Sequence, residues 1–118
     1  MKELVVIIRP EKLEILKQIM DDMYCGGMTI SSVMGCGAQK GFDEDEKGIK
    51  EIKGLMTTIN LLPKIRAEVV VPDDMVEKII MEIREKIAVG HVGDGKIFIR
   101  NIEGAVRIRT GERGTKAL

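Results

Sequence analysis

Residues 67–83 of the chain read AEVVVPDDMVEKIIMEI, and this stretch decides the fold because residues 4–20, LVVIIRPEKLEILKQIM, repeat its pattern. Each copy begins with a run rich in β-branched residues, which is typical of a strand. A proline follows, Pro10 or Pro72, which ends a strand and suits the first turn of a helix, where its missing N–H costs little. Acidic residues come next and complement the helix dipole. The chain therefore carries a weak internal duplication of a strand followed by a helix.

The helical stretches place their apolar residues at the helical period, so each predicts one buried stripe. The stripes are Leu13, Leu16, Met20 and Met23 in the first copy, and Val76, Ile79, Ile80, Ile83 and Ile87 in the second. Strand-like runs also occur at residues 28–36 and 96–100, with a shorter one at 105–110. This order predicts an α+β fold, a ferredoxin-like β-α-β-β-α-β sandwich with a short extra C-terminal strand. Both helices would cover one face of an antiparallel sheet, and the bare opposite face predicts an oligomer.

Composition limits the class of protein. The 118 residues suit a single domain, 1–118, and 19 basic residues balance 19 acidic ones. Zero net charge argues against a nucleic-acid partner bound through bulk charge. The apolar run at residues 4–8 is too short for a signal peptide or a membrane span, which predicts a cytoplasmic protein without membrane insertion. Cys25, Cys36 and the single His91 form no metal-binding spacing.

Residues 37–59 interrupt the compact pattern, because they contain four glycines and mixed charges but no sustained apolar period. A loop of this length in a small domain is usually functional or disordered. The loop is interpreted either as a solvated insert or as a loop that binds a partner protein. The candidate ligand-binding residues at its two ends favour the partner-binding loop.

A glycine-rich turn precedes the fourth predicted strand. Gly90, Gly95 and Lys96 match the first part of a phosphate-binding P-loop, but Ile97 stands where Ser or Thr would hold magnesium, and a strand follows instead of a helix. Glycine amides and a lysine still suit an anion. Arg107 and Arg109 are two residues apart, so on a strand they would share one face and could hold a phosphate between them. A salt-bridged surface pair is the alternative.

The third predicted strand carries a second polar row, Lys64, Arg66 and Glu68. Lys64 lies at one foot of the long loop and Gln39 at the other, so pairing of the flanking strands would bring together a cation and an amide that suit a small dicarboxylate. A usual nucleophile and base pair is lacking, so the chain is not expected to be an enzyme.

Several segments, taken together and in order, resemble the PII nitrogen-regulatory family. They are Ile7-Ile8-Arg9-Pro10, Gly27-Met28-Thr29, Gly35-Cys36-Gly37-Ala38-Gln39-Lys40-Gly41, Leu62-Pro63-Lys64, Glu68-Val69-Val70-Val71, Gly93-Asp94-Gly95-Lys96-Ile97-Phe98 and Val106-Arg107-Ile108-Arg109-Thr110-Gly111-Glu112. The resemblance implies a homotrimer whose sheets face inward, with ATP and ADP competing for clefts between subunits. It also implies a T-loop at 37–59, a B-loop at 89–96, and a C-terminal loop and tail at 103–118.

The resemblance also implies the ligand-binding residues. Those for the nucleotide are Ile7, Thr29, Gly35, Gly37, Gln39, Glu68, Val70, Gly93, Asp94, Gly95, Lys96, Arg107 and Arg109. Those for 2-oxoglutarate are Gln39, Lys40, Gly41 and Lys64, and Gln39 would help to coordinate Mg²⁺ when ATP and 2-oxoglutarate are both bound.

The resemblance has departures. Ala38 stands where the family commonly has an arginine that reaches the phosphates, and the only tyrosine, Tyr24, lies outside the long loop, so uridylylation of a loop tyrosine is not available. The expected function is nitrogen-regulation signalling through the T-loop to nitrogenase, glutamine synthetase or an ammonium transporter. The loop is more similar to the nitrogenase-regulating branch, which implies a link to nitrogen fixation. A PII-like trimer that senses another small anion and a slow ATPase are the alternatives.

Overall fold

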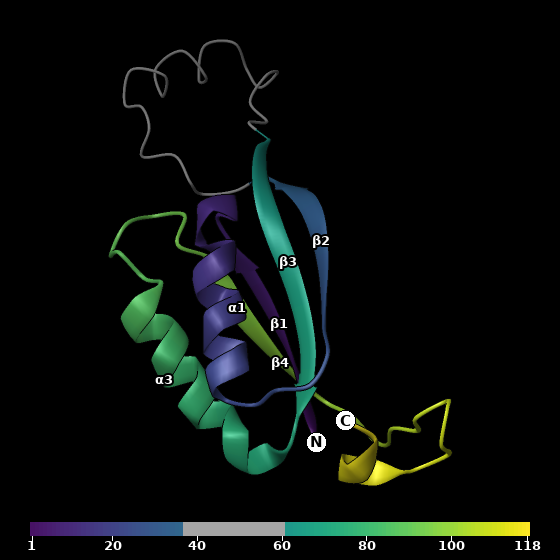
Figure 1. The fold of residues 1–118 in the computed structure, drawn as a ribbon. Coiled ribbons are helices and arrows are strands. Elements are labelled where there is room, and N and C mark those ends of the chain that lie inside the picture. The colour runs from purple at the N-terminus through teal and green to yellow at the C-terminus, as the bar shows by residue number, and fades with distance from the viewer. Residues whose placement is uncertain (37–60) are drawn as a thin grey trace, which may run out of the picture.

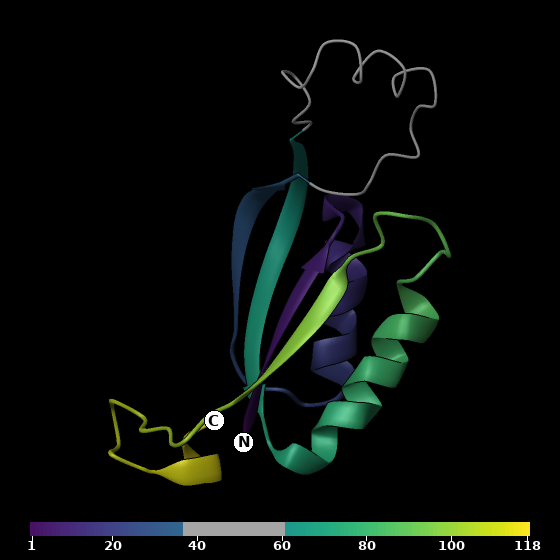
Figure 2. The same cartoon turned by 180° about the vertical axis from the view of Figure 1, so that it is seen from behind.

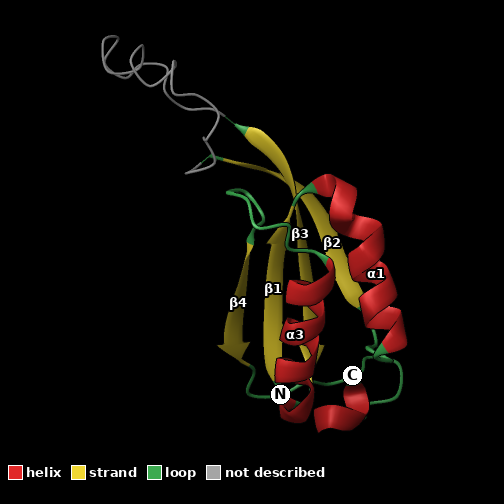
Figure 3. Ribbon diagram, turned by 90° about the vertical axis from the view of Figure 1, so that its left-hand side faces the viewer, coloured by secondary structure: helices red, strands yellow, loops and turns green. Residues whose placement is uncertain are grey.

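The computed structural model of the chain describes residues 1–36 and 61–118 (Figure 1). The described strands and helices are β1 (Lys2–Ile8), α1 (Leu13–Asp22), β2 (Met28–Gly35), β3 (Leu62–Val71), α3 (Val76–Lys86) and β4 (Lys96–Asn101). The strands form one antiparallel sheet in the order β2-β3-β1-β4. Both helices lie in front of this sheet in Figure 3. The predicted ferredoxin-like arrangement is confirmed.

The duplicated prolines stand where each strand gives way to a helix. Pro10 begins a 3₁₀ turn, Pro10–Lys12, that leads into α1. Pro72, with φ of −65°, directly precedes the 3₁₀ turn Asp73–Met75 that leads into α3. The fixed φ of proline suits the first turn of a helix, and the acidic residues beside it face the positive end of the helix dipole. β1 and β3 are therefore each followed by a 3₁₀ turn and then a helix, with the two prolines one position apart relative to that turn.

The core lies between the sheet and the two helices and is aliphatic. Alternate residues of β1 and β3 point into it, namely Leu4, Val6, Ile8, Ile65, Ala67, Val69 and Val71. The helices contribute Leu16, Ile19, Met20, Val76, Ile79, Ile83 and Ile87, whereas Leu13, Met23 and Ile80 from the predicted stripes are only partly buried. Among the described residues, no polar or charged side chain is buried.

The opposite face of the sheet, seen from behind in Figure 2, carries both charged and apolar side chains. The polar row predicted on β3 lies here, and Arg66 pairs with Glu68 at 3.1 Å. Glu3 of β1 lies 3.6 Å from Arg100 of β4, and Phe98 is 52% exposed. Neither α1 nor α3 covers this face, in agreement with the bare face expected from the sequence.

The short fifth strand predicted at residues 105–110 is wrong. The chain forms only a single bridge there, between Val106 and Arg113, and turns back on itself. Gly111, with φ of +77°, donates its N–H to the carbonyl oxygen of Arg107 at 2.7 Å. The backbone N–H of Arg107 donates to the backbone carbonyl oxygen of Glu112 at 2.9 Å. Because these backbone groups pair within the turn, the segment adds no strand to the sheet. The argument that Arg107 and Arg109 share one face of a strand therefore fails.

Candidate functional site

The turn between α3 and β4 is organised by one carboxylate. Asp94 accepts the N–H groups of Val89 and Gly90, both at 2.9 Å, on its Oδ2. Its Oδ1 lies 3.0 Å from the guanidinium of Arg9, which also donates to the carbonyl oxygen of Val92 at 2.6 Å. Burial raises the pKa of Asp94, but the hydrogen bonds from the Gly90 and Val89 amides and the charge of Arg9 outweigh it and hold the pKa below its ordinary value. The turn therefore contains a carboxylate whose charge is already compensated.

Arg9 is a residue that sequence reasoning missed as a contributor to the site. It follows β1 directly, at the same end of the sheet at which β4 begins. Its position after a strand and before Pro10 could have placed it at this end, but its partner Asp94 is 85 positions away, and the sequence contains no local signal for that pairing.

Gly95 brings the same turn against β1. A Cβ atom on this glycine would lie 1.8 Å from the carbonyl oxygen of Ile7, and the φ of Gly95 is +114°. Only glycine fits this combination of close approach and positive φ. Lys96 follows as the first residue of β4, paired with Ile7, and its side chain is exposed. As expected, a strand rather than a helix follows the lysine, so this is not a P-loop.

Lys64 joins the turn from β3. Its Nζ donates to the carbonyl oxygen of Gly93 at 2.9 Å. Burial, with a contribution from the nearby Arg9, lowers the pKa of Lys64. Across the β2–β3 pair, a Cβ atom on Gly35 would lie 3.3 Å from Cγ of Lys64. We refer to Ile7, Gly35, Lys64 and residues 93–96 as the loop-end group.

A second set of the predicted residues lies further along the sheet, from its middle toward the end at which β1 begins. Thr29 and Glu68 are register partners on β2 and β3, and with Val70 they line a cavity of about 300 Å³. Glu3, Gly27, Ala117 and Leu118 complete the lining. We refer to Thr29, Glu68 and Val70 as the tail-end group.

Arg107 reaches the tail through its side chain. The guanidinium of Arg107 donates to the carbonyl oxygen of Leu118 at 2.9 Å and lies 3.6 Å from a carboxylate oxygen of Glu112. Arg109 lies in the exposed turn that follows. The structure therefore associates Arg107, but not Lys96, with the tail-end group.

The predicted nucleotide residues that the structure describes are spread over several rows of the sheet. On β1, Ile7 pairs with Arg66 while Glu3 pairs with Val70, and four residues of strand separate these rows by about 13 Å. The row of Thr29 and Glu68, which pairs with Val5, lies between these two rows. Gly37, Gln39, Lys40 and Gly41 lie outside the described residues. The described part of the site thus consists of two half-sites spread along one sheet.

Neither a metal centre nor a membrane span is found among residues 1–36 and 61–118. No group of three His, Cys, Asp or Glu side chains there could hold a metal ion. The predicted Mg²⁺ ligand, Gln39, lies outside this part of the chain. None of the helices in these ranges is long and apolar enough to cross a membrane.

Comparison with known proteins gives a consistent result along the whole chain. The model of the family described as "Nitrogen regulatory protein P-II" matches residues 1–112. The chain is 45% identical over 118 residues to "Nitrogen regulatory protein P-II 2" of Methanothermobacter thermautotrophicus, with 100% of this chain and 97% of that protein covered. It is 42% identical to "Nitrogen regulatory protein P-II" of Bradyrhizobium diazoefficiens and 41% identical to the protein of that name from Haemophilus influenzae. In these two cases both chains are covered completely.

Proposed function

Because the chain belongs to the nitrogen regulatory protein P-II family, we propose that it is a signalling protein that binds ATP or ADP together with 2-oxoglutarate. It acts as a cytoplasmic homotrimer and regulates a target protein by contact through residues 37–59. The candidate targets are nitrogenase, glutamine synthetase and an ammonium transporter. Its role is regulatory rather than catalytic.

The observation that carries this proposal is that the described nucleotide residues form two groups spread along one sheet. Ile7 and Lys96 share one row of the sheet, whereas the row of Thr29 and Glu68 lies about 7 Å away along the strands and that of Val70 about 13 Å away. In a homotrimer whose sheets face inward, the loop-end group of one copy adjoins the tail-end group of the next. Each cleft between subunits then contains a complete site.

The chemistry of each half-site suits one part of a nucleotide. At the loop end, the exposed Lys96 provides a cation, and the pairing of Asp94 with Arg9 removes a carboxylate charge that would otherwise repel phosphate. At the tail end, the cavity combines the apolar Val70 with the hydroxyl of Thr29, which suits a base and a ribose.

Lys64 is the described residue proposed for 2-oxoglutarate. Its Nζ now donates to the Gly93 carbonyl oxygen at 2.9 Å, and a carboxylate of the ligand would replace this neutral acceptor with a charged one. Gln39, Lys40 and Gly41 would complete this site, with Mg²⁺ held partly by Gln39. A ligand at this position adjoins the proposed target-binding loop and can therefore control its conformation.

Calorimetry with ATP, with and without 2-oxoglutarate and Mg²⁺, tests the ligand assignment. We expect 2-oxoglutarate to strengthen ATP binding only when Mg²⁺ is present. Lys64→Ala should remove that effect while ADP binding changes little, and Lys17→Ala, at an exposed position on α1, is the matched control. Equal losses of ADP binding and of the 2-oxoglutarate response would contradict the role given to Lys64, and absence of nucleotide binding would contradict the proposal as a whole.

Mixed trimers test the division of the site between copies. Lys96→Ala removes the loop-end cation, and Gly27→Phe fills the tail-end cavity at a glycine around which a Cβ atom would meet nothing within 4 Å. Each variant alone should bind ATP poorly. When the two are unfolded and refolded together, trimers that contain both variants gain intact clefts, so binding should partly recover. Absence of recovery would place both half-sites in one chain and contradict the proposed cleft.

A further inference from the structure

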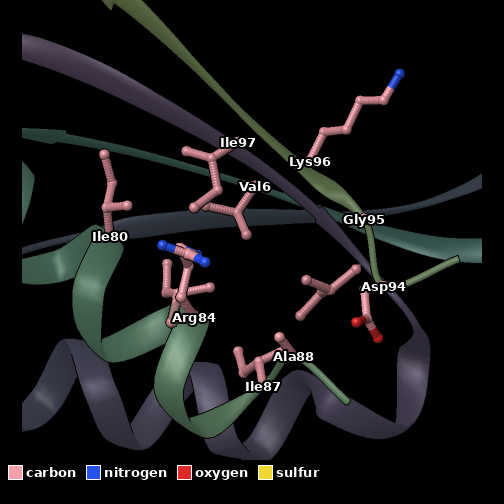
Figure 4. Close-up of a pocket in the computed structure, with 11 residues that line it drawn as sticks. Val6, Ile80, Arg84, Ile87, Ala88, Asp94, Gly95, Lys96 and Ile97 are labelled. Carbon is pink, nitrogen blue, oxygen red and sulfur yellow. The ribbon is translucent and has the colours of Figure 1, made fainter. Parts of the chain in front are cut away.

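A second cavity, of about 290 Å³, lies between α3 and β4 on the helix side of the sheet (Figure 4). Its walls are aliphatic and include Val6, Ile80, Ile83, Ile87 and Ile97. It exists because β4 is an edge strand that α3 only partly covers, so that Ile99 of this strand is 48% exposed. This volume is at the small end of the range for ligand pockets, about 300–1,000 Å³.

One cation faces this cavity from α3. Arg84 lies four residues from both Ile80 and Ala88, so the three side chains share one face of the helix and its continuation. In Figure 4 the Arg84 guanidinium lies in the space between α3 and β4. Among the described residues, no carboxylate lies within 4.0 Å of it, although the neighbouring Lys86 of the same helix is paired with Glu82 at 2.7 Å.

The other charged residues that line the cavity, Asp94 and Lys96, do not offer their charges to a ligand inside it. The Asp94 oxygens are occupied by Arg9 and by the amides of Val89 and Gly90. Lys96 contributes to the rim, but its side chain points away from the cavity in Figure 4. The cavity therefore offers an aliphatic interior and a single available positive charge.

We propose that this cavity is a second ligand site, on the helix side of the turn 94–96 that it shares with the proposed nucleotide cleft, and that it binds a small amphiphilic monoanion. The carboxylate of the ligand pairs with Arg84, and its aliphatic body lies among Ile80, Ile83, Ile87 and Ile97. Charge complementarity selects an anion over a cation or a neutral chain. The apolar walls disfavour a dianion, because its second charge would lose water without gaining a partner. 2-Oxoglutarate and nucleotides therefore fit this site poorly.

Octanoate is a suitable probe because it combines one carboxylate with an aliphatic chain. We would titrate the nucleotide-free trimer with octanoate and follow backbone amide shifts by NMR. We expect saturable binding at millimolar or lower concentration, with the largest shifts in α3 and β4. Octylammonium, which has the same chain and the opposite charge, should bind at least about tenfold more weakly. Binding of both probes with equal affinity, or no saturable binding of octanoate, would overturn the proposal.

Two variants assign the binding to this cavity. Arg84→Gln should weaken octanoate binding at least about tenfold, whereas Lys78→Gln, the same type of charge removal on the same helix outside the cavity, should leave it unchanged. Ala88→Phe should block binding by filling the mouth. A wild-type amide spectrum away from α3 and β4 shows that a variant is folded, and if Ala88→Phe does not fold, Arg84→Gln decides. Unchanged octanoate affinity in Arg84→Gln would refute the site, whether or not nucleotide binds in its own cleft.

Discussion

Replacing Gly95 with alanine should be among the most damaging single-methyl changes in the described part of the chain. The added Cβ would lie 1.8 Å from the Ile7 carbonyl oxygen and 2.9 Å from its carbon, and real Cβ contacts are essentially never closer than 3.0 Å. The oxygen must therefore retreat from 1.8 Å to at least 3.0 Å, a movement of at least 1.2 Å. Both atoms belong to backbone, so no side-chain rotation can relieve the overlap.

The expected loss of stability has two parts. Alanine at φ of +114° costs about 1–3 kcal/mol, because this region is sparsely populated by residues with a Cβ atom. Separating β4 from β1 at the Ile7–Lys96 pair weakens one or two ladder hydrogen bonds, each worth about 0.5–1.5 kcal/mol. We therefore expect the free energy of unfolding to fall by about 1.5–6 kcal/mol. Because Lys96 moves with the strand, ATP affinity should fall as well.

Two other glycines separate these contributions. Gly90 has a φ of +86° but open space around its Cβ position, so Gly90→Ala should cost only about 1–2 kcal/mol for the strained backbone. Gly104 has open space without a positive φ, so Gly104→Ala should be neutral or stabilising by up to about 1 kcal/mol. The free energies of unfolding of the three glycine variants can be measured by urea unfolding monitored by circular dichroism. The protein concentration is kept fixed because a trimer is proposed. A Gly95→Ala variant no less stable than Gly90→Ala would refute the steric argument.

Two further predictions concern the core and the acid sensitivity of the turn. Ile79→Ala should lower the free energy of unfolding by about 2–5 kcal/mol in the same urea assay, because Ile79 is fully buried. Met81→Ala, on the exposed face of α3, should cost less than about 1 kcal/mol. Similar losses for the two variants would contradict the assignment of Ile79 to the core. Asp94 has a folded pKa below its ordinary value of 3.8, so its stabilisation is complete above that value and is lost as the pH falls through the lower folded pKa. Asp94→Asn should therefore destabilise the protein at neutral pH and make its urea midpoint fall less as the pH is lowered. Glu14→Gln, at an exposed position, should have neither effect. If the urea midpoint of Asp94→Asn falls in acid as steeply as that of the wild type, the Asp94 carboxylate does not contribute to the acid sensitivity.

The fold was predictable from local signals that agree with one another. Pro10 and Pro72 lie within one position of each other at the strand-to-helix transition of the two halves, and the apolar periods on either side of them change from that of a strand to that of a helix. Such signals depend on a few neighbouring residues, so they survive in a single sequence. The partial exposure of Leu13 and Ile80 was not predictable, because it depends on where the opposite element ends.

The segment at residues 105–110 shows where the same reasoning fails. Its alternating valine, isoleucine and arginine residues have the period of a strand, but a strand also needs a partner along its length. Gly111 allows the chain to reverse, and the hydrogen bonds of Arg107 then close within the turn. In a single sequence, a strand and a tight turn with the same composition differ mainly in what lies opposite them, and this information is absent from the local pattern.

The glycine-rich turn illustrates how a motif can be matched for a different physical reason. In a P-loop, glycines allow backbone amides to approach phosphate, but here Gly95 is explained by the Ile7 carbonyl oxygen, which leaves no room for a Cβ atom. The glycine would be required even if no anion were bound, so its presence is not by itself evidence for a phosphate site. The proposed anion site rests instead on charge: the Asp94 carboxylate pairs with Arg9, while Lys96 is exposed beside it. A phosphate approaching this end of the sheet therefore meets a compensated carboxylate and an available ammonium group, and the distant pairing of Arg9 with Asp94 creates this difference.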